Sequence, residues 1–302
     1  MTGSNAPGSP LVSVVVPCHN IRGEWLHETI ASIRAQTHPA IEIIVVDDAS
    51  TRPDTLEALT ALEASCTVIR RDRNGGVGAA INTGVAAAKG VYFTTLGDDL
   101  IDPPYLAEAA AVLTNDPTIG MVHCRGDLFG TQSGPWNLPD FTIERQLFEN
   151  CVFAPSLYRR EDWVTVGGLD EQIKGLVDYD FIMKLLSLGR GVHRLDHTWF
   201  HYRRPGDSTI DWLQEDRSRE VASRARIFRN SIDLYADNAE PFWEQILDMM
   251  HELRRVRGER NDLYHRYRPL ERVRQSRVGA RAWTRARVLR RSLRRAGQLV
   301  RR

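Results

Sequence analysis

The sequence has no long hydrophobic run and no closely spaced pair of cysteines. A membrane-spanning helix needs about 20 consecutive apolar residues, and no segment of the chain provides them. Residues 1–10 are polar and lack the apolar stretch of a secretory signal, so we expect a flexible N-terminus. The four scattered cysteines argue against a zinc site or a disulfide framework and fit a reducing compartment. These absences predict a cytoplasmic protein.

The chain does have the composition of a protein with a buried core. Hydrophobic residues make up 42% of the 302 residues and charged residues 26%, which is ordinary for a globular domain. The net charge of +1 conceals an asymmetry, because residues 271–302 contain twelve arginines and one acidic residue. The other 270 residues then hold 28 basic and 38 acidic side chains, a formal charge of −10. An acidic body therefore carries a cationic tail.

Strand-like and helix-like segments alternate through the first two thirds of the chain. Short apolar runs typical of buried strands alternate with segments of helical spacing, joined by short connections. This pattern predicts an α/β domain over residues 11–213, with a Rossmann-like, mostly parallel sheet and helices on both faces. The expected strands are 11–16, 41–46, 66–69, 91–96 and 121–124, and the expected helices are 25–35, 56–63, 77–89 and 105–113.

A helical extension is expected from residue 214 to residue 302. Its first part has apolar residues at alternating steps of three and four, a short seam suited to docking on the body or on a second copy of the chain. Its arginine-rich end is amphipathic and includes Trp283, which fits peripheral binding to an anionic membrane surface. Homo-oligomer formation is the main alternative, and the acidic body argues against nucleic acid. The seam residues are Ile246, Met249, Leu253, Val256, Leu263, Tyr267 and Leu270.

Carboxylates follow two of the predicted strands, and polar residues follow a third. Asp47 and Asp48 come after the second strand, and Asp98 and Asp99 come after the fourth. Ligands of parallel sheets bind beyond the carboxyl ends of the strands, where these side chains should meet. Crowded carboxylates repel one another unless a cation is present. A hard divalent ion that bridges a carboxylate and a diphosphate would relieve that repulsion.

Five segments in a fixed order carry a family resemblance. They are VSVVVPCHN, EIIVVDDAST, RNGGVGAAINTG, GVYFTTLGDDL and GGLDEQIKGLVDYDFIMKLLSLG. Their order and spacing resemble the family-2 inverting glycosyltransferases, which have the GT-A fold and belong to the nucleotide-diphospho-sugar transferase superfamily. The resemblance covers roughly residues 11–205. It implies transfer of a hexose-type sugar from a nucleotide donor, most often UDP-linked, to a cell-envelope glycan or a lipid-linked acceptor.

The resemblance implies roles for individual donor-site residues. Pro17 and Asn20 would belong to the first nucleotide-facing loop, and Asp48 would hydrogen-bond the base of the donor. Asp98 would face the ribose or a metal-bound water, and Asp99 would bind Mn²⁺ or Mg²⁺ at the diphosphate. Each carboxylate also has a purely structural alternative: a loop or helix-capping role for Asp48, and a turn before the next helix for Asp98 and Asp99.

The glycine-rich segment fails as a dinucleotide fingerprint, because Ile81 stands where a third glycine is needed. A tight turn that lets the backbone approach the nucleotide is the alternative, with Arg73 and Asn74 beside it. A turn with no ligand remains open. Family members often carry arginine at the position of Ile81, so that contact is missing or supplied elsewhere.

Asp178 matches the general base of the family, although Val177 replaces the glutamate that normally precedes it. Asp180 is the rival candidate. The resemblance implies a single in-line displacement that inverts the anomeric carbon. A non-catalytic scaffold of the same fold, which recruits partners to the membrane, is the alternative function, and its only support is the departures at Ile81 and Val177.

Two further features, an arginine pair and an aromatic segment, each allow a functional and a structural interpretation. Arg203 or Arg204 would clamp phosphate, or their segment is a surface loop. Among the aromatic residues of segment 126–150, Trp136 would stack on a sugar or would pack beneath the loop.

Overall fold

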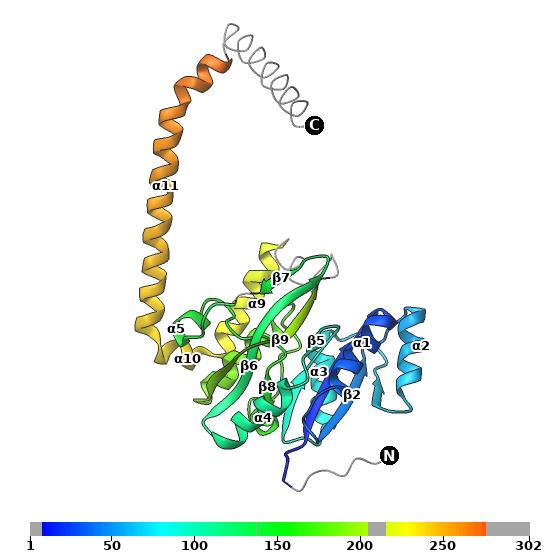
Figure 1. Cartoon of the computed structure of the whole chain (residues 1–302). Coiled ribbons are helices and arrows are strands. Elements are labelled where there is room, and N and C mark those ends of the chain that lie inside the picture. Colours follow the sequence, from blue (N-terminus) through cyan, green and yellow to red (C-terminus); the bar gives the residue numbers. More distant parts are fainter. Residues whose placement is uncertain (1–7, 137, 205–215, 276–302) are drawn as a thin grey trace, which may run out of the picture. The chain divides into compact units, whose positions relative to one another are not determined.

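The computed structural model describes residues 8–136, 138–204 and 216–275 (Figure 1). The chain forms two compact units, residues 1–239 and residues 240–302. Each unit is described separately below.

A parallel sheet forms the first half of the larger unit, with strand order β3-β2-β1-β4. Its central strands are apolar on both faces because helices cover both faces. Val14 and Val16 lie in one apolar cluster with α1 and α2, while Val15 faces α3, which approaches closely at Gly84. The elements are β1 (Val12–Cys18), α1 (Gly23–Arg34), β2 (Ile41–Asp47), α2 (Pro53–Leu62), β3 (Thr67–Arg70), α3 (Val77–Ala87) and β4 (Tyr92–Thr95).

The short strand β8 joins this half to the second half of the sheet. It runs antiparallel to β4 on one side and to β6 on the other, and β6 is parallel to β9. The parallel strands of both halves therefore end at the same edge. The elements are β5 (Leu100–Ile101), which pairs with β9, β6 (Ile119–Gly130), β7 (Gly134–Trp136), which pairs with β6, β8 (Leu157–Arg159) and β9 (Gly191–Arg204).

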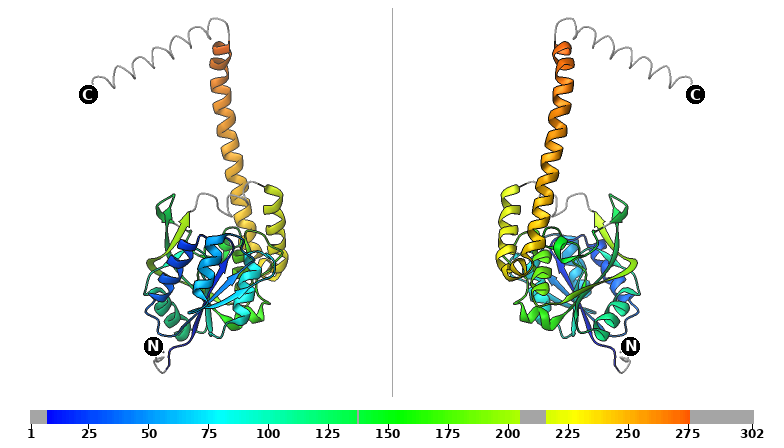
Figure 2. Two further views of the ribbon diagram at one scale, coloured as in Figure 1. Left: turned by 90° about the vertical axis from the view of Figure 1, so that its right-hand side faces the viewer. Right: turned by 90° about the vertical axis from the view of Figure 1, so that its left-hand side faces the viewer.

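The other helices of the larger unit lie along its second half. Helix α7 contacts both α9 and α10, and Figure 2 shows these helices from two sides. The elements are α4 (Tyr105–Asn115), α5 (Ile143–Gln146), α6 (Arg160–Thr165), α7 (Val177–Ser187), α9 (Arg217–Asn230) and α10 (Ile232–Asp237).

The predicted fold class is confirmed: a GT-A-type α/β sheet covered by helices, with a helical C-terminal region. The sequence pattern missed β8 and β9, because β8 has three residues and β9 lacks a continuous apolar run. We predicted a helical extension over residues 214–302; helix α9 begins at Arg217, and the larger unit, which continues to Ala239, includes α9 and α10. Amphipathic spacing identifies a helix without identifying the surface that it covers.

The described part of the smaller unit is a single helix, α11 (Ala239–Gln275). Every side chain from residue 247 to residue 268 is exposed. Within the described ranges, no helix has both the length and the apolar character that crossing a bilayer requires. Most of the arginine-rich tail, including Trp283, lies outside the described residues.

Candidate active site

The loops after β1 and β2 are joined at the carboxyl edge of the sheet. Pro17 pairs with Val46 at the end of the β1–β2 ladder. Asn20 has a positive φ of 55° and accepts hydrogen bonds through Oδ1 from the backbone N–H groups of Thr51 and Arg52, at 2.8 and 2.9 Å. The side chain of Asn20 therefore holds the two loops together. Burial raises the pKa of nearby Cys18 to about 11, so its thiol stays protonated.

Asp48 is held by the glycine-rich turn between β3 and α3. Its carboxylate accepts hydrogen bonds from the backbone N–H groups of Gly75, at 3.0 Å, and Gly76, at 2.7 Å. The Nε of Arg71 lies 3.0 Å from Oδ1 and forms an ion pair with it. Asp48 is only 2% exposed, and its contacts with Gly75, Gly76 and Arg71 fix the shape of the turn.

The two polar residues predicted beside that turn are both exposed. Asn74 accepts a hydrogen bond from Gly76 N–H at 3.0 Å, which is a local turn contact. Arg73 points to solvent, and the cation that meets Asp48 is Arg71, which the sequence reasoning missed. Arg71 is the first residue after β3, a position at which polar residues were otherwise recognised as candidates.

Asp98 and Asp99 follow β4 at the same edge. Burial raises the pKa of Asp98, and burial together with the neighbouring Asp98 charge raises the pKa of Asp99 well above its usual range. Oδ1 of Asp99 accepts a hydrogen bond from the backbone N–H of Arg203 at 2.9 Å. The backbone carbonyl of Asp99 also accepts a hydrogen bond from Thr29 of α1, which fixes the turn.

Arg203 is the cation closest to this carboxylate pair. Its Nε donates to the carbonyl of Asp98 at 2.7 Å, and its Nη2 lies 2.6 Å from Oε2 of Glu28. The guanidinium lies over the rings of Trp25 and Phe129, with 5.0 and 4.4 Å to the centroids. Arg203 is 7% exposed and lies within strand β9, so the surface-loop interpretation is wrong for it.

Asp178 lies in the first turn of α7, at the same edge of the sheet. The preceding Val177 is buried and packs within van der Waals distance of Gly78, at the start of α3. Oδ2 of Asp178 accepts a hydrogen bond from Nδ2 of Asn150 at 3.1 Å, and Asn150 lies in the segment that leads into β8. Burial raises the pKa of Asp178. Asp178 as a whole residue is half-buried.

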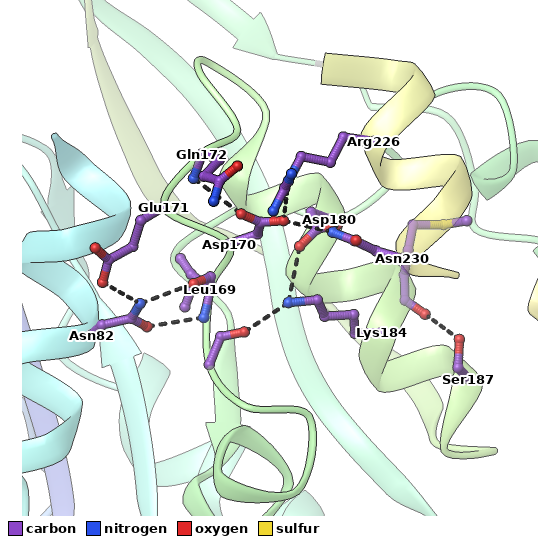
Figure 3. Close-up of polar contacts among 12 residues, drawn as sticks. Asn82, Leu169, Asp170, Glu171, Gln172, Asp180, Lys184, Ser187, Arg226 and Asn230 are labelled. Carbon is purple, nitrogen blue, oxygen red and sulfur yellow. Dashed lines mark hydrogen bonds and ion pairs between the residues drawn. The ribbon is translucent and has the colours of Figure 1, made fainter. Parts of the chain in front are cut away.

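Asp180 occupies a different environment from Asp178. It is fully buried, lies 3.1 Å from Nζ of Lys184, and accepts a hydrogen bond from Nδ2 of Asn230 at 2.8 Å. Asn230 also donates to Asp170, which pairs with Arg226 of α9. Figure 3 shows these contacts, which tie α9 to α7.

The same network reaches α3 through Asn82. Its Oδ1 accepts the backbone N–H of Leu169 and its Nδ2 donates to the carbonyl of Leu169, both at 2.9 Å (Figure 3). Asn82 therefore holds the segment before α7 against the helix that follows the glycine-rich turn.

Aromatic side chains from β7, β9 and the segment before β8 form a cluster. Trp136 packs against Phe153 and Tyr202, with ring centroids 4.8 and 4.4 Å apart. Burial and the charges of Asp99 and Asp98 raise the pKa of Tyr202, which places its phenol near both carboxylates. Trp136 thus packs beneath the loop, and Phe153 and Tyr202 were not recognised from the sequence.

A sequence comparison then decides the family. The family described as "Glycosyl transferase family 2" matches residues 13–162, which include the ends of β1, β2 and β4. Residues 13–162 form a glycosyl transferase family 2 domain.

Relatives of this chain include proteins named for polysaccharide synthesis. The "O-antigen biosynthesis protein RfbC" of Myxococcus xanthus is 29% identical over 201 residues, which cover 64% of this chain and 16% of that protein. The "Chondroitin synthase" of Pasteurella multocida is 27% identical over 66% of this chain and 21% of its own length. An "Uncharacterized glycosyltransferase RT0329" of Rickettsia typhi is 32% identical over 60% of each chain. The match therefore spans only about a sixth of the O-antigen biosynthesis protein and about a fifth of the chondroitin synthase.

Solved structures share the fold. "S. aureus TarS 1-349 in complex with UDP-GlcNAc" aligns with a TM-score of 0.57 and 21% identity, over 74% of this chain and 72% of that one. The "Mannosyltransferase PcManGT from Pyrobaculum calidifontis in complex with GDP-Man and Mn2+" aligns with a TM-score of 0.55 and 18% identity, over 87% and 84%.

The donor set of the family-2 domain fits a hard divalent cation. Among the described residues, no group of three or more His, Cys, Asp or Glu side chains is placed to hold a metal. Mg²⁺ and similar ions need fewer protein ligands, because one or two carboxylates act together with substrate phosphates and water. The mutual repulsion of Asp98 and Asp99 is the kind of strain that such a cation removes.

Proposed function

We propose that this edge of the sheet binds a nucleoside-diphosphate sugar and transfers the sugar, with inversion, to an acceptor hydroxyl. The supporting observation is the placement of two kinds of carboxylate at one edge: the crowded pair Asp98 and Asp99 beside Arg203, and the half-buried Asp178 at the start of α7. The family-2 domain supports the same reaction class.

The donor lies along the loops after β1, β2 and β3. Pro17 and Asn20 border the nucleotide, because Asn20 joins the first two loops. Asp48 orients the base, since its carboxylate fixes the turn at Gly75 and Gly76. The exposed side chains of Arg73 and Asn74 extend that border, and Asp98 faces the ribose. UDP is the expected nucleotide, and two aligned structures contain UDP or UDP-GlcNAc.

Asp99 is the proposed ligand of Mn²⁺ or Mg²⁺. When bound, the ion neutralises the negative charge that builds up on the leaving diphosphate. Arg203 supplies a permanent positive charge from the neighbouring strand and fixes Asp99 through its backbone N–H.

Asp178 is the proposed general base. The acceptor oxygen attacks the anomeric carbon as the bond from that carbon to the diphosphate oxygen breaks, and the hydroxyl proton moves to the carboxylate of Asp178. Such proton transfer contributes about 10²–10⁴-fold to the rate. Asp180 is unsuited to the role, because Lys184 and Asn230 occupy its carboxylate and it is fully buried.

The acceptor is proposed to be a cell-envelope glycan or a lipid-linked saccharide, and the setting to be the cytoplasmic face of the membrane. The names of the O-antigen and chondroitin relatives support a polysaccharide acceptor. Attachment through the arginine-rich tail rests on sequence alone.

Titration with UDP in the presence and absence of Mn²⁺ tests the donor site. We expect Mn²⁺ to tighten UDP binding at least tenfold and Asp99→Ala to remove that gain. Asp248→Ala, which removes an exposed carboxylate of α11, is the matched control and should behave as wild type. Metal-independent binding of UDP in the wild-type protein would refute the assignment of Asp99.

A further inference from the structure

Helix α11 carries large apolar side chains that face solvent. Leu253 is 55% exposed, Val256 47% and Leu263 51%, and the side chains around them from residue 247 to residue 268 are exposed as well. Helices draw most of their stability from packing of an apolar face, and α11 also contains Gly258, a weak helix former. We therefore expect the apolar side of α11 to pack against a partner.

The apolar side chains of α11 follow a heptad. Ile246, Leu253 and Tyr267 occupy its first position, a, and Met249, Val256 and Leu263 occupy its fourth position, d. Arg260 takes the remaining a position. An a/d repeat of this kind matches another helix with the same repeat, and one polar residue at position a is a known way to fix register.

We propose that α11 forms a parallel, in-register, two-stranded coiled coil with a second copy of this chain over residues 246–267. Charge supports this occupant and this orientation. In such a pair, each g position meets the e position five residues further along the other helix. Glu252 then meets Arg257 of the second copy, and the symmetric contact forms as well.

The remaining flanking positions are compatible with the same pairing. Gln245 faces Met250 and Glu259 faces Tyr264, so no like charges meet at these flanking positions. At the seam the two Arg260 side chains face each other, and each lies beside Glu259 of the other copy, whose carboxylate offsets that repulsion. A lipid surface fits less well, because Glu252 and Glu259 border the apolar stripe and would enter an anionic headgroup layer.

Two leucines of α11 provide a matched pair of variants. Leu253 lies on the seam, whereas Leu247 lies at position b and is similarly exposed, at 49%. Sedimentation of the full chain should show a dimer. Leu253→Asn should raise its dissociation constant by about 100-fold, and Leu247→Asn by less than threefold. A wild-type monomer at micromolar concentration, or equal effects of the two variants, would overturn the proposal.

A cysteine cross-link tests register and direction. Val256 at position d faces Val256 of the second copy only in a parallel, in-register pair. Val256→Cys should therefore give a disulfide-linked dimer on mild oxidation. Asp262→Cys, at an outward position, should stay monomeric on a non-reducing gel, as should the wild-type chain. Failure of Val256→Cys to cross-link would refute the parallel pairing. Binding to vesicles of phosphatidylcholine and phosphatidylglycerol tests the alternative. If the vesicles bound the wild-type chain, and if Leu253→Asn and Leu247→Asn weakened that binding equally, α11 would pack against a membrane instead of a second copy.

Discussion

Nδ2 of Asn150 donates a hydrogen bond to Oδ2 of Asp178 over 3.1 Å, which joins the segment before β8 to the first turn of α7. In the proposed mechanism this carboxylate takes the proton of the acceptor hydroxyl. The chemical step is therefore expected to depend on Asp178 directly and on Asn150 through the orientation of that carboxylate.

Asp178→Asn should abolish turnover while leaving donor affinity nearly unchanged, because the amide keeps the shape of the carboxylate and cannot take a proton. The expected loss in kcat is about 10²–10⁴-fold, measured by UDP release with excess acceptor. Asn150→Ala should lower kcat by about tenfold with little change in the KM for the donor. Full activity of Asp178→Asn would move the base elsewhere.

Stability should respond to pH through Asp178. Burial raises its pKa in the folded protein, so the folded state binds this proton more tightly than the unfolded state does. The stability contribution of this group therefore falls as pH rises from the unfolded pKa through the folded one. Asp178→Asn should then melt at a higher temperature than wild type at pH 7, and the difference should shrink as the pH is lowered toward 4. A lower melting temperature of the variant at pH 7 would contradict the shift.

Lys184→Met should destabilise the larger unit strongly. It leaves the fully buried Asp180 without its cation, and breaking a buried pair in this way costs about 3–5 kcal/mol. Denaturant unfolding measures the loss. Arg229→Met is the control, since Arg229 is an exposed cation of α9 next to Asn230 in the chain. Equal unfolding midpoints for the two variants would mean that the network in Figure 3 contributes little.

Two helical glycines should respond in opposite ways to alanine. A Cβ at Gly84 of α3 would lie 2.4 Å from Cγ1 of Val15, so Gly84→Ala should cost about 1–3 kcal/mol of stability by overpacking. Gly258 of α11 has open space around it, so Gly258→Ala should raise helicity and strengthen α11 by about 1 kcal/mol. Denaturant unfolding and circular dichroism measure the two effects.

The first half of the sheet could be predicted from sequence, because its central strands β1 and β2 are apolar runs that become largely buried. The carboxylates at Asp48, Asp98 and Asp99 could be predicted for a related reason, since they follow β2 and β4. The hydrogen-bond partners of Asp178 and Asp99 could not be predicted. Asn150 precedes a three-residue strand with no pattern of its own, and Arg203 lies more than a hundred residues from Asp99 in the chain. Only the pairing of β5 with β9 brings Arg203 next to Asp99.

The central position of β8 has a consequence for synthesis. Strand β6 leaves the ribosome about thirty residues before β8, its neighbour on one side, and about sixty before β9, its neighbour on the other. The apolar residues Met121 and Val122 of β6 lack both flanking strands until β8 is made, and they lack β9 for longer. Non-local pairings of this kind slow folding. A chaperone that protects nascent chains would therefore act chiefly on the interval between β6 and β9, after the parallel half of the sheet has already been made.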